Sequence, residues 1–419
     1  MTAIIRLAWQ SLANRKATAM LTLLTVAISV TLLLGVERVR TQAKASFANT
    51  ISNTDLIVGA RAGQVNLLLY SVFRIGNATN NIDWQSYQDI RQHRSVKWAI
   101  PISLGDSHRG FRVIGTNTAY FDHYQYGRKQ PLQFADGGAF SGLFETVIGA
   151  DVARQLNYKL GDEIIIAHGI SDKSFSRHDN LPFKVVGILA PTGTPVDRSV
   201  HVSLEAIEAI HVGWESGARL GATPDAATLA HYEFKPKQIT AFMLGLNSKI
   251  QTFAMQRYIN TYASEPLSAI MPGIALHELW DMMSIAEQAL LIVSGFVVVA
   301  GLLGMLSSLL TSLNERRREM AILRAMGARP GHIFFLLISE ATMLTAAGII
   351  LGLGVLYGLM ALAQPVIQQY FGLFIEISAP TSYEFSLLGI VLVAGMLVGL
   401  VPALRAYMHS LADGMTIKV

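Results

Sequence analysis

Cysteine is absent from the 419 residues of this sequence. Its absence excludes disulfides, thiolate nucleophiles and cysteine metal ligands together, and it fits an oxidising or a reducing compartment equally well. Charged residues are also few, at 15% of the chain, whereas soluble domains contain about 25%. Together with a positive mean hydropathy, this shortage of charge is typical of chains with several membrane spans.

The motifs of common hydrolases are missing as well. The sequence contains no H-E-x-x-H, no G-x-S-x-G and no G-x-x-x-x-G-K-[ST]. The segment 169–174, GISDKS, comes nearest to a phosphate-binding loop, but its spacing is wrong. The net charge of +4 is small and dispersed. We therefore expect no enzymatic activity, no cofactor bound by this chain itself and no nucleic-acid partner.

Long apolar runs predict transmembrane helices. The predicted spans are 17–36, 284–313, 333–363 and 383–407. The first offers twenty residues without a charge. At a rise of about 1.5 Å per residue, twenty residues cross a hydrocarbon core of about 30 Å. Small residues recur in the second and third spans, which predicts close packing against partner helices in the bilayer.

A cleavable signal peptide is the alternative for the first span, because AKA at 43–45 is an A-x-A site. Two features argue against cleavage. The apolar core is longer than that of a signal peptide, and charged residues stand between the core and the site. These residues are Glu37, Arg38, Arg40 and Lys44.

The distribution of lysine and arginine predicts the orientation of the spans. The basic residues beside the span ends are Arg6, Arg15, Lys16, Arg316, Arg317, Arg318, Arg324, Arg329, Arg405 and Lys418. In contrast, the loop 364–382 contains no lysine or arginine. Both termini and the segment 314–332 are therefore expected in the cytoplasm. Segment 1–16 is amphipathic and predicts a helix in the inner interface or packed on the spans, and 408–419 predicts a tail.

The segment 37–283 then lies outside the membrane. Its short β-rich runs and helical pieces predict an α/β or α+β domain between the first and second spans. Apolar residues continue past the first span at helical spacing, which predicts an amphipathic stalk; these are Val36, Val39, Ala43, Phe47 and Ile51. A similar series precedes the second span: Leu276, Leu279, Met283 and Ala286.

Nine of the eleven histidines fall in this outer domain, and imidazole is the commonest metal ligand. His168, His178 and Asp179 share one predicted hairpin loop and are weak candidates for a metal site. The alternative is that scattered histidines occupy a solvated surface, since no H-x-H or H-x-x-x-H pair occurs. Within the spans, Glu287 and Glu340 are costly to bury. A proton relay would need a second carboxylate or histidine on a neighbouring span, and none is convincing.

The segment 314–332 predicts a short cytoplasmic helix. Its residues are strong helix formers, and Gly327 with Pro330 predicts the end of the helix. Met320, Leu323 and Met326 form an apolar stripe flanked by arginines. A solvated arginine loop that only fixes the topology is the alternative. Because such a loop needs neither a stripe nor a terminator, we expect this helix to contact another protein.

This segment carries the motif R-x-x-E-x-A-I-L-R-A-x-G, made of Arg316, Glu319, Ala321, Ile322, Leu323, Arg324, Ala325 and Gly327. With it, the chain resembles the MacB/FtsX family of ABC transporter permeases, the type VII mechanotransmission superfamily that includes the LolC and LolE type. The run VIGADVARQLNYKLGDEIIIAHG, followed by FKVVGIL, is similar to the smaller lobe of the family's outer domain.

The resemblance implies a dimer of permeases, expected here as a homodimer, above a dimer of separate ATP-binding subunits that hold ATP and magnesium. It makes 314–332 the coupling helix, with contacts to the ATPase from Arg316, Glu319, Met320, Leu323, Arg324, Met326 and Gly327. It also implies a location in the inner membrane of a bacterial cell and a periplasmic domain of two lobes, one at about 50–115 plus 235–275 and one inserted at about 116–234.

The expected function is therefore that of a permease subunit that transmits the ATPase cycle to a periplasmic domain. Its expected cargo is a lipoprotein, a peptide, an antibiotic or another hydrophobic molecule, with a periplasmic adaptor, carrier or lipoprotein as a further partner beside the lipid bilayer. Two alternatives stay open. One is a permease related to metal or haem transport, and the other is a non-transporting, FtsX-like regulator of a periplasmic partner such as a cell-wall hydrolase.

Overall fold

The computed structural model describes residues 10, 15–168, 181–212, 226–229, 231–315, 317–371 and 377–412. The chain divides into two compact units. The helical unit comprises residues 1–42, 284–365 and 375–419, and the α/β unit comprises residues 43–283 and 366–374. Each unit is described by itself.

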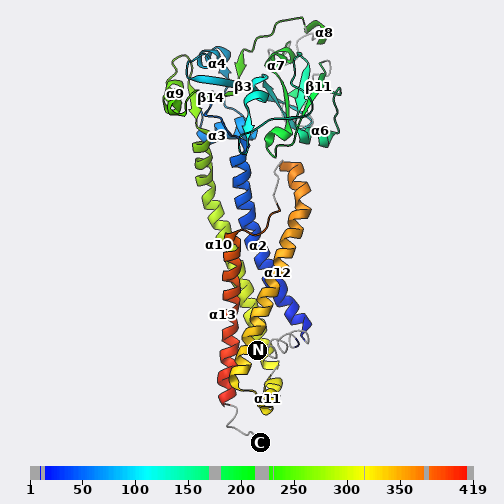
Figure 1. The fold of residues 1–419 in the computed structure, drawn as a ribbon, viewed down its shortest axis with the longest axis vertical. Helices are drawn as coiled ribbons and strands as arrows, with labels where there is room; N and C mark the ends of the chain where they lie inside the picture. Colours follow the sequence, from blue (N-terminus) through cyan, green and yellow to red (C-terminus); the bar gives the residue numbers. More distant parts are fainter. Residues whose placement is uncertain are drawn as a thin grey trace. The chain divides into compact units, whose positions relative to one another are not determined.

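The long helices of the chain are α2 (Lys16–Thr50), α10 (Pro272–Glu315), α12 (Pro330–Phe371) and α13 (Ser382–Ala412). All four are long and apolar enough to cross a membrane, which confirms the four predicted spans. The short helix α11 (Arg317–Ala325) lies between α10 and α12 in the chain (Figure 1). Helices α2 and α10 each contain residues of both units.

Small residues bring the helices of the helical unit close together. A Cβ atom on Gly352 of α12 would lie 2.8 Å from the carbonyl oxygen of Ala27 on α2, and one on Gly301 of α10 would lie 2.5 Å from the hydroxyl of Ser29. Side chains larger than hydrogen would force these helices apart. Close backbone approach of this kind favours helix association in lipid, where apolar burial gives no advantage.

Neutral hydrogen bonds also join these helices. The Ser29 hydroxyl donates to the carbonyl of Val297 at 3.1 Å, and the Thr31 hydroxyl donates to the carbonyl of Gly352 at 3.0 Å. Around them lies an apolar core drawn from all four long helices, including Val30, Met305, Leu344 and Val391.

The α/β unit contains a mixed sheet with the strand order β15-β1-β14-β3-β4-β12-β8-β11-β7. These strands are β1 (Leu56–Ala60), β3 (Val96–His108), β4 (Phe111–Thr116), β7 (Phe134–Gly137), β8 (Glu145–Ile148), β11 (Phe183–Leu189), β12 (Ser199–Ser203), β14 (Ala241–Leu246) and β15 (Leu267–Ile270). The pairs β4–β12 and β8–β11 are parallel, and the other neighbours are antiparallel.

Further short elements complete this unit. The helices are α3 (Gln64–Leu68), α4 (Trp84–Arg91), α5 (Ala119–His123), α6 (Ala150–Leu156), α7 (Leu204–Ile210), α8 (Ala226–Leu229) and α9 (Thr252–Asn260), with the single turns η1 (Leu69–Phe73), η2 (Pro195–Arg198) and η3 (Lys249–Gln251). The short strands are β2 (Ile82–Asp83), β5 (Gln125–Tyr126), β6 (Gln130–Pro131), β9 (Glu163–Ile164), β10 (Ala167–His168) and β13 (Gln238–Ile239).

The long strand β3 links two parts of the sheet. Its first part pairs with β14 and its second part with β4, and the register shifts between Leu104 and Ser107. Figure 1 shows α4 and α9 at the β14 end, and α6 and α7 at the β11 end. A mixed α/β domain between the first and second long helices is therefore confirmed, since α2 precedes it and α10 follows it.

Burial along the strands follows from which faces are covered. Every residue of β14 is buried, because alternate residues face two different cores. Phe242 and Leu244 pack with α4 and α9, whereas Ala241 and Met243 face the core shared with α5. A strand buried on both faces reads as a continuous apolar run, which is how AFMLGL reads in the sequence.

The predicted stalk stripe is only partly correct. Helix α2 does continue to Thr50, and Phe47 packs on Phe73 with ring centroids 4.5 Å apart. Val39, however, is 61% exposed, and its neighbours Glu37 and Arg38 are buried instead. Helical spacing located the helix but not its buried face, because charged side chains on α2 find partners elsewhere in the helical unit.

Candidate functional site

Helix α11 is built as a short, firmly ended element. Gly327 adopts φ +96°, a backbone conformation that side chains rarely allow. The Ala328 amide donates to the carbonyl of Leu323 at 3.0 Å, and the Gly327 amide donates to that of Arg324 at 2.9 Å. This is the Schellman pattern of a helix C-terminus. The predicted end of the helix at Gly327 is thereby confirmed, and α12 starts at Pro330, a favoured first residue.

The predicted apolar stripe of α11 is divided between two faces. Met320 packs against Leu313, Ile333, Leu337 and other residues of the chain's own long helices. This differs from the expectation that Met320 faces a partner, because the stripe also has to cover the ends of α10 and α12. Met326 is 72% exposed, as expected of a docking residue.

Ile322 supplies an exposed apolar contact that the stripe did not include. It is 53% exposed and lies four residues before Met326, so the two share one face of the helix end. Leu323 and Arg324 are half-buried. Arg316 and the side chain of Glu319 lie outside the described residues. The exposed apolar surface of α11, as far as it is described, is therefore Ile322 with Met326, which we call the α11 tip.

The metal candidates lie at the edge of, or outside, the described residues. His178, Asp179 and the side chain of His168 lie outside the described residues. Among the described residues, no group of three histidine, aspartate or glutamate side chains is placed to hold a metal ion.

Two histidines of the α/β unit, His201 and His108, are buried inside the fold. His201 is fully buried against the rings of Tyr120 and Phe121, with Nδ1 3.2 Å from the carbonyl of Val147. Burial, aided by the nearby positive charge of Arg74, lowers the pKa of His201 to about 3. This histidine is therefore neutral at physiological pH.

His108 is also buried. Its Nδ1 lies 2.7 Å from the carbonyl of Ile165, and its Nε2 lies 3.0 Å from the Tyr158 hydroxyl. Both ring nitrogens of His108 thus have polar neighbours within the fold, which favours a structural role over metal binding.

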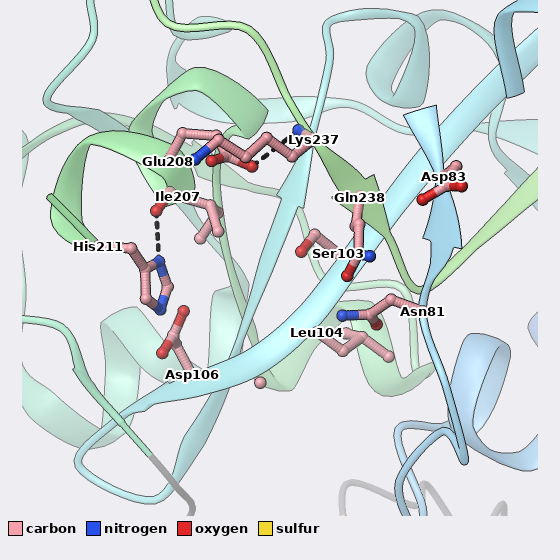
Figure 2. Close-up of a pocket in the computed structure, with 11 residues that line it drawn as sticks. Asn81, Asp83, Ser103, Leu104, Asp106, Ile207, Glu208, His211, Lys237 and Gln238 are labelled. Carbon is pink, nitrogen blue, oxygen red and sulfur yellow. Dashed lines mark hydrogen bonds between the residues drawn. The ribbon is translucent and has the colours of Figure 1, made fainter. Parts of the chain in front are cut away.

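A polar hollow of about 480 Å³ lies beside β3 in the α/β unit (Figure 2). Its lining residues come from β3, from the end of α7 and from the paired strands β2 and β13; they are Asn81, Asp83, Ser103, Leu104, Gly105, Asp106, Ile207, Glu208, His211, Lys237 and Gln238. Glu208 accepts a hydrogen bond from the Lys237 amide at 3.0 Å, and His211 Nδ1 lies 2.5 Å from the carbonyl of Ile207.

No sequence motif marks this hollow. Its residues lie in segments up to 157 positions apart, from Asn81 to Gln238, and no local spacing connects them. Three carboxylates, those of Asp83, Asp106 and Glu208, share its lining with one lysine and one histidine, so its formal charge is negative.

The acidic residues of the spans are also placed. Glu340 is buried within the helical unit, in the first half of α12. Glu287 lies on α10 with its Oε2 4.0 Å from Arg40 Nη1 on α2. Both acidic residues therefore lie on long helices of the helical unit.

Together these features define a class of protein. Four helices can cross a membrane, a mixed α/β domain is inserted between the first two, and a short helix with an exposed apolar tip separates the second from the third. The chain is a multi-pass membrane protein whose extramembrane domain is continuous with two of its spans.

Two family models match the chain. One, described as FtsX-like permease C-terminal, matches residues 291–411, and one described as MacB-like periplasmic core domain matches residues 19–260. The second match covers more than half of the chain. The protein belongs to this family: it is an FtsX-like ABC transporter permease with a MacB-like periplasmic core domain, as the resemblance predicted.

Three curated proteins are similar over short segments. "Probable syringafactin export ATP-binding/permease protein SyfD" of Pseudomonas syringae pv. tomato is 34% identical over 109 residues, 26% of this chain and 16% of that protein. "Probable export ATP-binding/permease protein MacB" of Pseudomonas entomophila is 33% identical over 109 residues, with the same two shares.

The third is "Uncharacterized ABC transporter permease YknZ" of Bacillus subtilis, 32% identical over 74 residues, 18% of this chain and 19% of that protein. The chain thus spans less than a fifth of the length of the curated relatives it matches.

Solved structures give weaker similarities. The periplasmic region of MacB from Actinobacillus actinomycetemcomitans shares 8% identity at a TM-score of 0.35, over 55% of this chain and 94% of that one. The extracellular domain of the transporter YknZ from Gram-positive bacteria shares 13% identity at a TM-score of 0.30, over 52% and 99%. TM-scores below 0.5 carry no argument about function.

Proposed function

We propose that this protein is the membrane subunit of an ABC exporter and that it transmits the movement of separate ATP-binding subunits to its periplasmic α/β unit. The observation that carries the proposal is helix α11. A nine-residue helix closed by a Schellman motif presents the exposed α11 tip directly between two long apolar helices. A partner that presses on this tip pushes against α10 and α12 together.

The continuity of the long helices supports the second half of the proposal. Helix α10 leads from the α/β unit to Glu315, two residues before α11 begins at Arg317, and α2 also contains residues of both units. A displacement of these helices therefore reaches the α/β unit through covalent, hydrogen-bonded helix rather than through a flexible linker. Two of the relatives are named as probable export proteins, which supports export as the direction of transport.

In this scheme the α11 tip and both termini face the cytoplasm of a bacterial cell and the α/β unit faces the periplasm. ATP and magnesium are bound by the partner subunits, and two copies of this chain form the membrane part. The cargo class is a lipoprotein, peptide, antibiotic or other hydrophobic molecule, delivered with a periplasmic adaptor, carrier or lipoprotein.

Co-purification tests the docking surface. The full-length chain, isolated from its own membranes in mild detergent, is expected to bring ATPase activity with it. Met326→Glu and Ile322→Glu should each reduce that activity at least tenfold, because a buried carboxylate would face the apolar contact. Ile250→Glu is the matched control, since Ile250 is 90% exposed but belongs to the α/β unit. Unchanged activity in both α11 variants would contradict the proposal.

A further inference from the structure

One turn of α2 carries three charged residues where an apolar stripe was expected. Arg38 is 4% exposed, and on α13 its partner Glu384 is 2% exposed. Arg38 Nε lies 2.9 Å from Glu384 Oε1, and Nη2 lies 3.2 Å from Oε2. Both carboxylate oxygens are thus held by one guanidinium, the bidentate geometry that fixes position as well as distance.

Arg38 also has contacts on α12. Arg38 Nη2 donates to the Tyr357 hydroxyl on α12 at 2.9 Å, and the guanidinium carbon lies 4.8 Å from the centre of the Tyr357 ring. The Tyr357 hydroxyl donates to the carbonyl of Ser378 at 2.9 Å. Arg38 therefore touches α12 and α13 at the same time.

Glu384 also caps the start of α13. Its Oε2 accepts the Thr381 amide at 2.8 Å, while its own amide donates to the Thr381 hydroxyl at 3.2 Å. This reciprocal pair is a capping box, which orders the first turn of a helix. The position of Glu384 is thus set by the helix it caps. We call Arg38, Tyr357, Thr381 and Glu384 the charge clamp.

The neighbouring residues link the same turn of α2 to α10. Glu37 is buried and accepts a hydrogen bond from Arg40 Nη2 at 2.8 Å, and Arg40 Nη1 lies 4.0 Å from Glu287 on α10. At this level α2 has charged contacts with α10 on one side and with α12 and α13 on the other.

Stability alone explains such a pair poorly. A buried ion pair adds little net stability compared with apolar side chains of the same volume, although removing one partner is costly. What it supplies is a single allowed geometry. The other described polar contacts between α2 and α12 include the neutral bond from Thr31 to Gly352, which a small shift of the helix can lengthen at lower cost.

We propose that the charge clamp is the point at which movement of α12 and α13 is transferred to α2. The inference rests on the proposed function, because it assigns a step of the transmission to named residues. Arg38 lies five residues before residue 43, where α2 enters the α/β unit. The charge clamp is thus close to the point at which α2 leaves the helical unit. Arg38 and Glu384 act as positioning residues and need no contact with cargo or ATP.

The first test measures how tightly the clamp holds α2 in the full-length chain in nanodiscs, without nucleotide. Spin labels on Ala45→Cys and Ser386→Cys, both exposed, are unique because the chain has no cysteine. The unmodified clamp should give one narrow distance distribution. Glu384→Gln keeps the capping box but loses the charge, and it should broaden the distribution at least twofold.

Further variants separate coupling from folding. Arg38→Gln with Glu384→Gln removes both charges of the pair and should also broaden the distribution, whereas Arg38→Glu with Glu384→Arg should narrow it again. Thr31→Val, which removes a neutral bond of α2, is the matched control and should leave the width unchanged. An unchanged width in the double glutamine variant, or equal broadening by Thr31→Val, would overturn the clamp.

The second test adds ATP to the complex with its ATP-binding subunits. The parent should show an ATP-dependent shift of the same distance, and the double glutamine variant should keep its ATPase activity and complex yield but lose the shift. Equal shifts in both proteins would overturn the inference while leaving the proposed function intact. A parent without ATPase activity or without a shift would instead contradict the proposed function, and the transfer role with it.

Discussion

Two buried ionisable sites, one in each unit of this protein, are accommodated in opposite ways. In the α/β unit, burial lowers the pKa of His201 to about 3 and so keeps it neutral, and its ring packs against the ring of Tyr120 in the core. In the helical unit, Arg38 and Glu384 are buried as a hydrogen-bonded ion pair that joins three helices. The first arrangement fills space, whereas the second specifies where one helix stands against two others.

The difference follows from what drives packing in each environment. Apolar burial from water holds a sheet domain together, so a polar core residue has to be hydrogen-bonded and, where it has no charged partner, uncharged. Helices in lipid gain nothing from apolar burial, and small residues and polar contacts decide their positions. Changes that remove one or the other feature should therefore have different consequences, which the following predictions rank by size.

The largest effect is expected for Glu384→Ala, which leaves Arg38 buried without its carboxylate. Loss of one partner of a buried pair costs about 3–5 kcal/mol. The free energy of unfolding, measured by denaturant titration in mixed micelles, should fall by that order. Phe385→Ala, at the exposed neighbouring position, should change it by less than about 0.5 kcal/mol. Equal losses in the two variants would show that the pair does not specify the helix positions.

A smaller loss is expected for Gly352→Leu, because its Cβ would meet the Ala27 carbonyl and the Val30 side chain. Forcing extra carbons into a packed contact costs about 1–3 kcal/mol. Gly354→Leu is the matched control on the same helix, since nothing lies within 4 Å of its Cβ position. The same unfolding titration distinguishes them. A stable Gly352→Leu protein would mean that close approach of α2 and α12 is dispensable.

Acid should destabilise the α/β unit through His201. Its folded pKa, about 3, is below the unfolded value of 6.5, so the unfolded state binds the proton first as pH falls. At pH 5.5, one unit below the unfolded pKa, this group should therefore lower stability by about 1.4 kcal/mol relative to pH 8. His201→Gln should flatten the dependence of the melting temperature on pH between 6.5 and 4.5, and His231→Gln, an exposed histidine, should not. If the melting temperature of His201→Gln depended on pH as steeply as that of the parent, the prediction would be wrong.

The smallest effect on stability is expected at the α11 tip. Met326→Glu exposes no core and breaks no described bond, so unfolding should change by less than about 0.5 kcal/mol. The same variant should lose co-purified ATPase activity, because its role is contact with a partner. A large loss of stability would show instead that Met326 supports the chain's own helices, as Met320 does.

Much of this architecture could be predicted from the sequence, because length and local pattern determine it. Four apolar runs gave the spans, and FKVVGIL corresponds to strand β11 residue for residue. Gly327 marked the end of α11 because a left-handed residue closes a Schellman motif. Each of these signals lies within a few neighbouring residues.

The features that were missed depend on distant residues. Arg38 and Glu384 are 346 positions apart, so in the sequence Arg38 was only a charge after a span. For the same reason the sequence could not show that Val39 is exposed or that Met320 packs inward. Helical spacing predicts that a face exists, and only the partners of that face decide whether it is apolar.

The most direct test of the central claim is the distance between Ala45→Cys and Ser386→Cys, measured by spin-label spectroscopy in the complex with and without ATP, in the parent chain and in Met326→Glu. If α11 receives the movement and the long helices carry it to the α/β unit, ATP should shift the distance in the parent and leave it unchanged in Met326→Glu. An ATP-dependent shift of the same size in both proteins, or none in the parent, would contradict the account.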